Sequence, residues 1–179
     1  MVGPKVGAEL RKRALLATLY ALAGMLVYIA FRFEWIYGVA AVLAVAHDAF
    51  LTVGLFSILG KEISLTVIAA LLTLVGYSMN DTIVIFDRVR ENLRLSRRES
   101  LAEVVNRSIN QSLVRCLNTS FTTFLVLAAL MFGFTFYIGN LDLIGFVIAM
   151  IIGVVVGTYS SLFIVSPLWL DLKKREFKG

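Results

Sequence analysis

The stretch VGYSMNDTIVIFDRVREN, residues 75–92, places Asn80 and Asp81 inside an otherwise uncharged apolar segment. From Ile63 to Asn80 the only ionisable group is one tyrosine phenol, so the segment can cross a bilayer, which needs ~20 apolar residues. At ~1.5 Å of rise per residue, Asp81 lies ~9 Å along a helix from Asp87, where dense charge begins. We therefore expect Asp81 within the hydrocarbon, where an ionisable residue indicates a functional site with a partner on another helix.

The composition around this stretch is that of an integral membrane protein. Of 179 residues, 59% are hydrophobic and only 16% are charged, and the mean hydropathy is +0.87, which excludes an ordinary soluble domain. The net charge of +5 does not indicate nucleic-acid binding, because Lys and Arg lie between apolar segments and form no basic surface with interleaved aromatic residues.

The sequence contains no motif for an enzyme or a metal centre. The single cysteine, Cys116, and the single histidine, His47, are far apart, and neither belongs to a CxxC pair or a ligand cluster. A phosphate-binding loop and a GxSxG nucleophile motif are also absent from the sequence. We therefore predict a protein that is not an enzyme and has no bound cofactor.

The apolar segments predict an all-α protein with five transmembrane helices. The predicted spans are about 14–33, 35–59, 63–87, 118–138 and 143–168, within a transmembrane domain of residues 14–170. Residues 1–13, with two glycines and a proline, are predicted to be a linker from an outer domain, and residues 171–179 a basic cytoplasmic tail.

Residues 100–115 are predicted to form an amphipathic helix on the cytoplasmic face. Ser100 and Glu103 have the spacing of a capping box, and apolar residues then recur at helical spacing opposite Asn and Arg side chains. Such a helix can lie on the membrane surface or pack on a neighbouring helix, and the sequence fits both arrangements.

Counting Lys and Arg gives the orientation. With the N-terminus outside, 12 of the 17 lie on the inner side: Arg32, the seven arginines from Arg88 to Arg115, and four in the tail. The opposite orientation leaves five inside and contradicts the positive-inside rule, so we expect the C-terminus in the cytoplasm.

Asp81 has two possible roles, and so does its nearest candidate counter-charge. Asp81 is either a proton-carrying or ion-paired acid, or a packing carboxylate satisfied by Asn80, Ser78 and Tyr77. Ser78 and Thr82 are at helical neighbour spacing to it, which makes the local face polar. Arg115, at the start of the fourth span, either pairs with Asp81 or extends to lipid phosphates as a topology anchor.

His47 and Asp48 interrupt the second span at its midpoint. Histidine titrates in the physiological range and a carboxylate can polarise it, so the pair fits a proton relay. Hydrogen bonding between helices explains it equally well. In the fifth span, Gly153 and Gly157 form GxxxG, a pattern that lets helices approach closely and predicts a packing face.

Residues 75–92 resemble the SecD/SecF family of protein-export membrane proteins, and within it the SecF subunits. The pattern GYSxNDTIVxxDRxREN carries the resemblance, with support from VGPKVG at 2–7, FRFEW at 31–35, AHDAFLTVG at 46–54, SLVRCLNTSFTT at 112–123 and GVVVGTYSSLF at 153–163. The resemblance implies a membrane fold of the resistance-nodulation-division type, and a chain that is the C-terminal five-helix part of such a subunit or of a fused SecD–SecF protein.

Function and partners are also implied by the resemblance. It implies a subunit of the cell inner membrane that uses the proton-motive force to move preproteins through the SecYEG channel. The implied partners are SecD, SecYEG, the preprotein, YajC and membrane lipids. Asp81 would bind the proton and Arg115 would be its charge partner, with Asn80, Thr82, Ser78, His47 and Asp48 as a polar network. A proton-driven exporter of small molecules or lipids, and a scaffold that transports nothing, are the alternatives.

Overall fold

The structure is a computed structural model. It describes residues 35–96 and 99–176 without a gap and, before them, residues 9, 12, 13, 16, 17, 19–21, 23, 24, 27, 28 and 31. The predicted linker and the predicted first span lie largely outside the described residues, and so does the end of the predicted tail, 177–179.

The continuously described part is a bundle of long helices, with no strand among its residues. The elements are α2 (Trp35–Ile58), α3 (Leu65–Leu95), α4 (Leu101–Gly133), the π-helical turn η1 (Phe134–Ile138), α5 (Leu141–Ser160), the π-helical turn η2 (Ser161–Val165) and α6 (Ser166–Glu176). In the described residues, four continuous helical segments are long and apolar enough to cross a membrane: Trp35–Ile58, Leu65–Leu95, Leu101–Ile138 and Leu141–Glu176. The prediction of an all-α, multi-pass membrane protein is confirmed.

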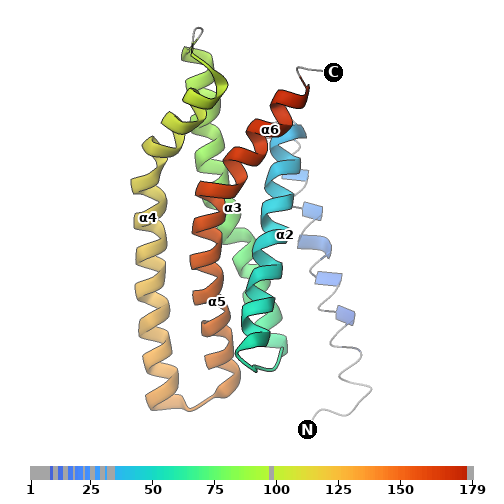
Figure 1. Cartoon of the computed structure of the whole chain (residues 1–179). Helices are drawn as coiled ribbons and strands as arrows, with labels where there is room; N and C mark the ends of the chain where they lie inside the picture. The colour runs from blue at the N-terminus through green and yellow to red at the C-terminus, as the bar shows by residue number, and fades with distance from the viewer. Residues whose placement is uncertain are drawn as a thin grey trace.

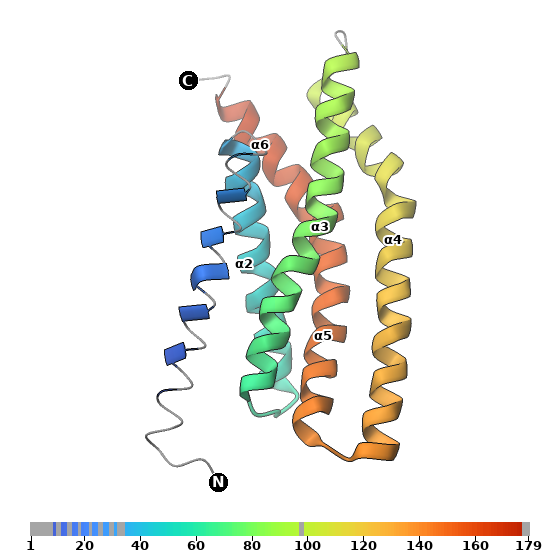
Figure 2. The ribbon, with the colours of Figure 1, turned by 180° about the vertical axis from the view of Figure 1, so that it is seen from behind.

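Helices α3 and α5 lie between α2 and α4 (Figures 1 and 2). The connection from α3 to α4 lies at the same end of the bundle as α6, and the two other connections lie at the opposite end (Figure 1). At that opposite end, Ser64 caps α3 through its hydroxyl, and Thr66 donates to the backbone oxygen of Asp142 at 3.1 Å, which ties the first turns of α3 and α5 together.

The predicted surface helix and the predicted fourth span are one continuous helix, so their separation was wrong. No Gly or Pro interrupts the chain between residues 101 and 132. The hydroxyls of Thr119 and Thr123 donate to the carbonyls of Arg115 and Thr119, each at 2.9 Å, so these side chains are satisfied without breaking the helix. The capping box of Ser100 and Glu103 is confirmed.

The apolar face of α4 near its start packs on protein. Val104 and Val105 are buried, and Ile109 packs against the core cluster that α3 and α6 share. Packing on a neighbour is therefore the arrangement that these residues adopt.

A buried amide holds the first turns of α4 against the end of α3. Nδ2 of Asn92 donates to Oγ of Ser108 and to Oε1 of Gln111, each at 2.8 Å, and Asn92 is buried. Because Asn92 is buried, its hydrogen bonds are not replaced by water when they are lost. We therefore expect Asn92→Ala to lower the free energy that holds the α3–α4 hairpin closed by ~1 kcal/mol. The measurement is tryptic cleavage or hydrogen exchange of residues 93–100, which should be faster in the variant. The exposed Asn106→Ala is the matched control, and equal cleavage of both variants would contradict the prediction.

Two apolar clusters fill the interior, one toward each end of the bundle. The first contains Tyr37, which stacks on Trp169 at 4.9 Å between ring centroids. The second gathers around Phe56 and Val147. Along α2, and from α5 into η2, buried polar residues lie between the two clusters. Together with two side chains of α3 they form a polar layer that consists of Asp48, Thr52, Ser78, Thr82, Thr158, Ser160 and Ser161, whereas Asp81 and Asn92 are further buried polar residues of α3 outside this layer.

Candidate functional site

Asp48 is the centre of the polar layer. The residue is buried, its Oδ2 accepts a hydrogen bond from Oγ of Ser78 at 2.6 Å, and its Oδ1 lies 3.1 Å from Nδ1 of His47. A Cβ on Gly157 would lie 3.7 Å from Oδ2 of Asp48 and 3.2 Å from Cβ of Ser78. Helices α2, α3 and α5 therefore meet at one carboxylate, and the small Gly157 leaves room for it.

Thr82 belongs to the same layer, one turn further along α3. Its Oγ1 lies 3.2 Å from Oγ of Ser161, which also lies 3.3 Å from the carbonyl oxygen of Ser78 and donates to it. Ser161 begins the π-helical turn η2. Pro167 explains this turn, because its ring would clash with the carbonyl of Phe163 in a regular α-helix, and the wider π turn avoids that.

A chain of hydroxyls joins α4 to the layer. The hydroxyl of Tyr77 donates to Oγ of Ser120 at 3.2 Å, and Oγ of Ser120 lies 2.6 Å from Oγ1 of Thr158. Thr158 in turn donates to the carbonyl of Val154 at 2.7 Å. These groups are satisfied among themselves, so they hold α3, α4 and α5 in register.

Asp81 is buried but stands apart from these bonds. It is 2% exposed, and its Oδ2 has no hydrogen-bond partner among the described residues. A packing role for Asp81 would require hydrogen bonds from Ser78 and Tyr77, but Ser78 donates to Asp48 and Tyr77 donates to Ser120. The exposed Asn80 is its hydrogen-bonding neighbour, so the carboxylate keeps free acceptor capacity inside a membrane helix.

Arg115 lies on α4, and its side chain is exposed at the surface of the described bundle. Its positive charge acts on Asp81 across the α3–α4 contact, through space and not through a direct ion pair in the described residues. A long guanidinium side chain at this place can approach the carboxylate or withdraw from it.

The two glycines of the GxxxG pattern lie where α5 approaches α3. A Cβ on Gly153 would lie 2.4 Å from both Cδ atoms of Leu74, closer than carbon atoms pack. Leu74 is itself 1% exposed, so it has little room to move away. Gly157 is crowded less severely, by Ser78.

The structure thus divides the predicted site residues into three groups. Asp48, His47, Ser78 and Gly157 come together, and Thr82 joins Ser161. Asp81 has Asn80 as its hydrogen-bonding neighbour and lies within electrostatic range of Arg115, while Gly153 lies apart from all three groups, against Leu74. Ser161 and Ser120 were not among the predicted site residues, and their only signal in the sequence is a hydroxyl in an apolar segment. Among the described residues, no three His, Cys, Asp or Glu side chains gather as they would around a metal ion.

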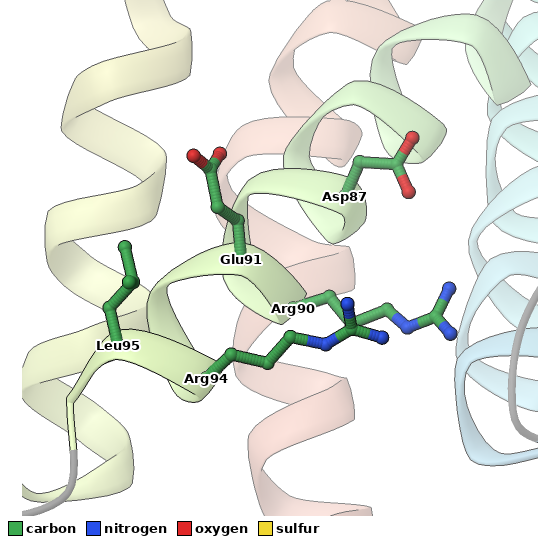
Figure 3. Close-up of a pocket in the computed structure, with 5 residues that line it drawn as sticks. All are labelled: Asp87, Arg90, Glu91, Arg94 and Leu95. Atoms are coloured by element: carbon green, nitrogen blue, oxygen red, sulfur yellow. The ribbon is translucent and has the colours of Figure 1, made fainter.

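A separate, charged pocket of about 440 Å³ lies at the end of α3 that leads into the α3–α4 connection. It is lined by Asp87, Arg90, Glu91, Arg94 and Leu95. Figure 3 shows the Arg90 and Arg94 side chains extending to one side of the helix, with Glu91 on the other. This open arrangement of mixed charges fits a helix end in water and at lipid headgroups.

Comparison with known proteins gives a match over nearly the whole chain. The family model described as "Protein export membrane protein SecD/SecF, C-terminal" matches residues 1–175. A protein translocase subunit SecF from Koribacter versatilis is 56% identical over 179 residues, which are 100% of this chain and 43% of that protein. A SecF from Pseudomonas aeruginosa is 47% identical over 177 residues, 98% of this chain and 56% of that protein.

A fused relative and its crystal structure agree with this match. A protein translocase subunit SecDF from Thermus thermophilus is 51% identical over 175 residues, 98% of this chain and 23% of that protein. The crystal structure of SecDF, a translocon-associated membrane protein from that organism, superposes with a TM-score of 0.88 at 50% identity, covering 96% of this chain and 23% of that one. The chain therefore spans about half or less of the length of these relatives.

Proposed function

Since the chain belongs to the SecD/SecF family of protein-export membrane proteins, we propose that it is the SecF-type membrane part of a Sec-pathway translocase, which couples the proton-motive force to preprotein transport. The observation that carries this proposal is the buried Asp81, whose carboxylate has an oxygen without a partner in the described residues. Ionisable residues at membrane depth mark ion and proton paths, because their charge is costly there.

Proton binding at Asp81 would change the forces between α3 and α4. As a carboxylate, Asp81 attracts the guanidinium of Arg115, which stays charged at any relevant pH. As a neutral acid, Asp81 no longer attracts this guanidinium. The two helices therefore have two preferred arrangements, and protonation of Asp81 biases the equilibrium between them. One charge crossing 100 mV supplies ~2.3 kcal/mol, enough to drive such a bias.

The proposed orientation follows from the charges at the two ends of the bundle. The α3–α4 connection and α6 lie at the same end (Figure 1), and most of the arginines and lysines of the described residues are there. By the positive-inside rule we assign this end to the cytoplasm and the α2–α3 and α4–α5 connections to the outside.

The proposed partners are those of the translocase as a whole. They are SecD, the SecYEG channel, the preprotein, YajC and membrane lipids, without nucleic acid. The names of the SecDF relatives support SecD as the immediate neighbour. Protons are the coupling ion, and no enzymatic step or bound cofactor is assigned to this chain.

The proposal is tested by transport of a preprotein into vesicles that contain the complete complex, with the proton gradient present or dissipated by an uncoupler. We expect Arg115→Gln to remove most of the gradient-dependent part, because the variant lacks the charge that responds to Asp81. The exposed Arg94→Gln is the matched control and should transport normally. Full gradient dependence in Arg115→Gln, or none in the wild type, would contradict the proposal.

A further inference from the structure

Asp48 is a second buried acid at membrane depth, and it has a different environment from Asp81. Both of its oxygens are engaged, one by Ser78 at 2.6 Å and the other by His47 at 3.1 Å. The His47 side chain is 35% exposed, whereas that of Asp48 is 2% exposed. Among the described residues, the histidine is therefore the more exposed member of the pair and lies in direct contact with the buried carboxylate.

We propose that His47 and Asp48 form a second proton-binding site, in which the imidazole passes protons to the carboxylate. With Nδ1–H donating to Oδ1 of Asp48, the outward Nε2 is free to accept a proton from water. Nε2 then gains one proton as Nδ1 gives one to Oδ1, which leaves a neutral histidine and a neutral aspartic acid. One proton has moved inward and no other group is consumed.

The surroundings of the pair contain few other groups that titrate. On α3 these are Tyr77, whose hydroxyl donates to Ser120, and Asp81, three residues from Ser78. On α5 the only ionisable side chain between Asp142 and Asp171 is a tyrosine, and Gly157 faces the carboxylate without a side chain. No cation other than an imidazolium at His47 stabilises the charge of Asp48 by direct contact in the described residues.

Proton uptake at Asp48 would be felt where three helices meet. A hydrogen bond to a carboxylate is about twice as strong as one to a neutral acid, so protonation weakens the hold of Asp48 on Ser78. Ser78 also contacts α5 at Gly157, and its carbonyl accepts a hydrogen bond from Ser161 at the start of η2. The charge on α2 therefore affects how α3, the helix that carries Asp81, packs on α5.

The site can be tested directly by infrared difference spectroscopy of the assembled complex between acid and neutral pH. We expect a carboxylic-acid band that is present in the wild type and in Asp81→Asn, and missing in Asp48→Asn. His47→Asn places an amide N–H near the position of Nδ1–H but cannot take up and pass on a proton, so the band should appear more slowly after a pH jump. Asp142→Asn, at an exposed acid, is the control and should leave this band unchanged.

A second variant keeps the test decisive if Asp48→Asn fails to fold. Ser78→Ala retains the acid and removes its donor, so the same band should shift in frequency. A band that is unaffected by both Asp48→Asn and Ser78→Ala would overturn the assignment, and so would a carboxylate that never becomes protonated.

Only the transport consequence rests on the proposed function. There we expect Asp48→Asn to lower gradient-dependent transport about tenfold, which corresponds to ~1.4 kcal/mol. If Asp81→Asn keeps its gradient dependence while the Asp48 band titrates, the proposed function fails and this site stands. If Asp81→Asn loses gradient dependence and Asp48→Asn changes neither band nor transport, the second site fails and the proposed function stands.

Discussion

Asp81→Asn should abolish gradient-dependent transport and leave the bundle folded. Asparagine has the shape of aspartate but cannot take up and release a proton, so α3 no longer changes charge. The free energy at stake is ~2.3 kcal/mol per charge at 100 mV, or a factor of up to about 50 in rate. The measurement is preprotein transport in vesicles with and without the gradient, on the complete complex.

The same variant should not destabilise the protein, which separates a coupling role from a packing role. One oxygen of Asp81 lacks a partner in the described residues, so removing its charge removes a desolvation cost and breaks few bonds. We expect thermal stability equal to the wild type or higher. The exposed Asp142→Asn should keep both stability and gradient dependence. Loss of folding in Asp81→Asn, or undiminished gradient dependence, would contradict the assignment.

Gly153→Ala should cause a larger loss of stability than alanine at Gly54, Gly76, Gly145 or Gly157. The added Cβ would lie 2.4 Å from the Cδ atoms of Leu74, which is buried in the α3–α5 contact. Overpacking of this kind costs ~1–3 kcal/mol. The measurement is the free energy of unfolding in a denaturant titration of the purified chain in detergent micelles.

Two other variants provide the controls for Gly153. Gly54→Ala has nothing within 4 Å of the new Cβ, so it should be neutral or slightly stabilising through helix propensity. The double variant Leu74→Ala with Gly153→Ala removes the clashing atoms and should recover part of the loss that Gly153→Ala causes alone. Equal stability of Gly153→Ala and Gly54→Ala would show that α5 can move away from α3.

The sequence predicted the membrane class and the helices well, because length, apolar content and charge spacing are local properties. The buried position of Asp81 and the capping box at Ser100 are examples. The partners of Asp48 could not be predicted, because adjacent positions on a helix do not reveal which neighbouring helix each side chain meets. His47 and Asp48 turn out to contact each other and, through Asp48, Ser78 of α3.

Two further features depend on structure beyond the local pattern. The continuity of α4 was missed because the amphipathic residues 100–115 and the apolar residues 118–138 were assigned to separate elements, whereas the threonine hydroxyls near their junction bond within one helix. The role of Ser161 was missed because it depends on the π turn, whose cause, Pro167, lies six residues further along. Neither feature changes the hydrophobic pattern that predicts a helix.

The position of the polar layer between two apolar clusters has a consequence for the resting membrane. Along α2 and α5 the apolar clusters lie on either side of the layer, so under the proposed function water that reaches the layer from one side would meet close-packed apolar side chains before the other. An idle complex would then leak few protons and would not waste the gradient of the cell. Under the proposed function, a passing proton would need one cluster to loosen at a time, so each crossing would depend on a movement of the helices.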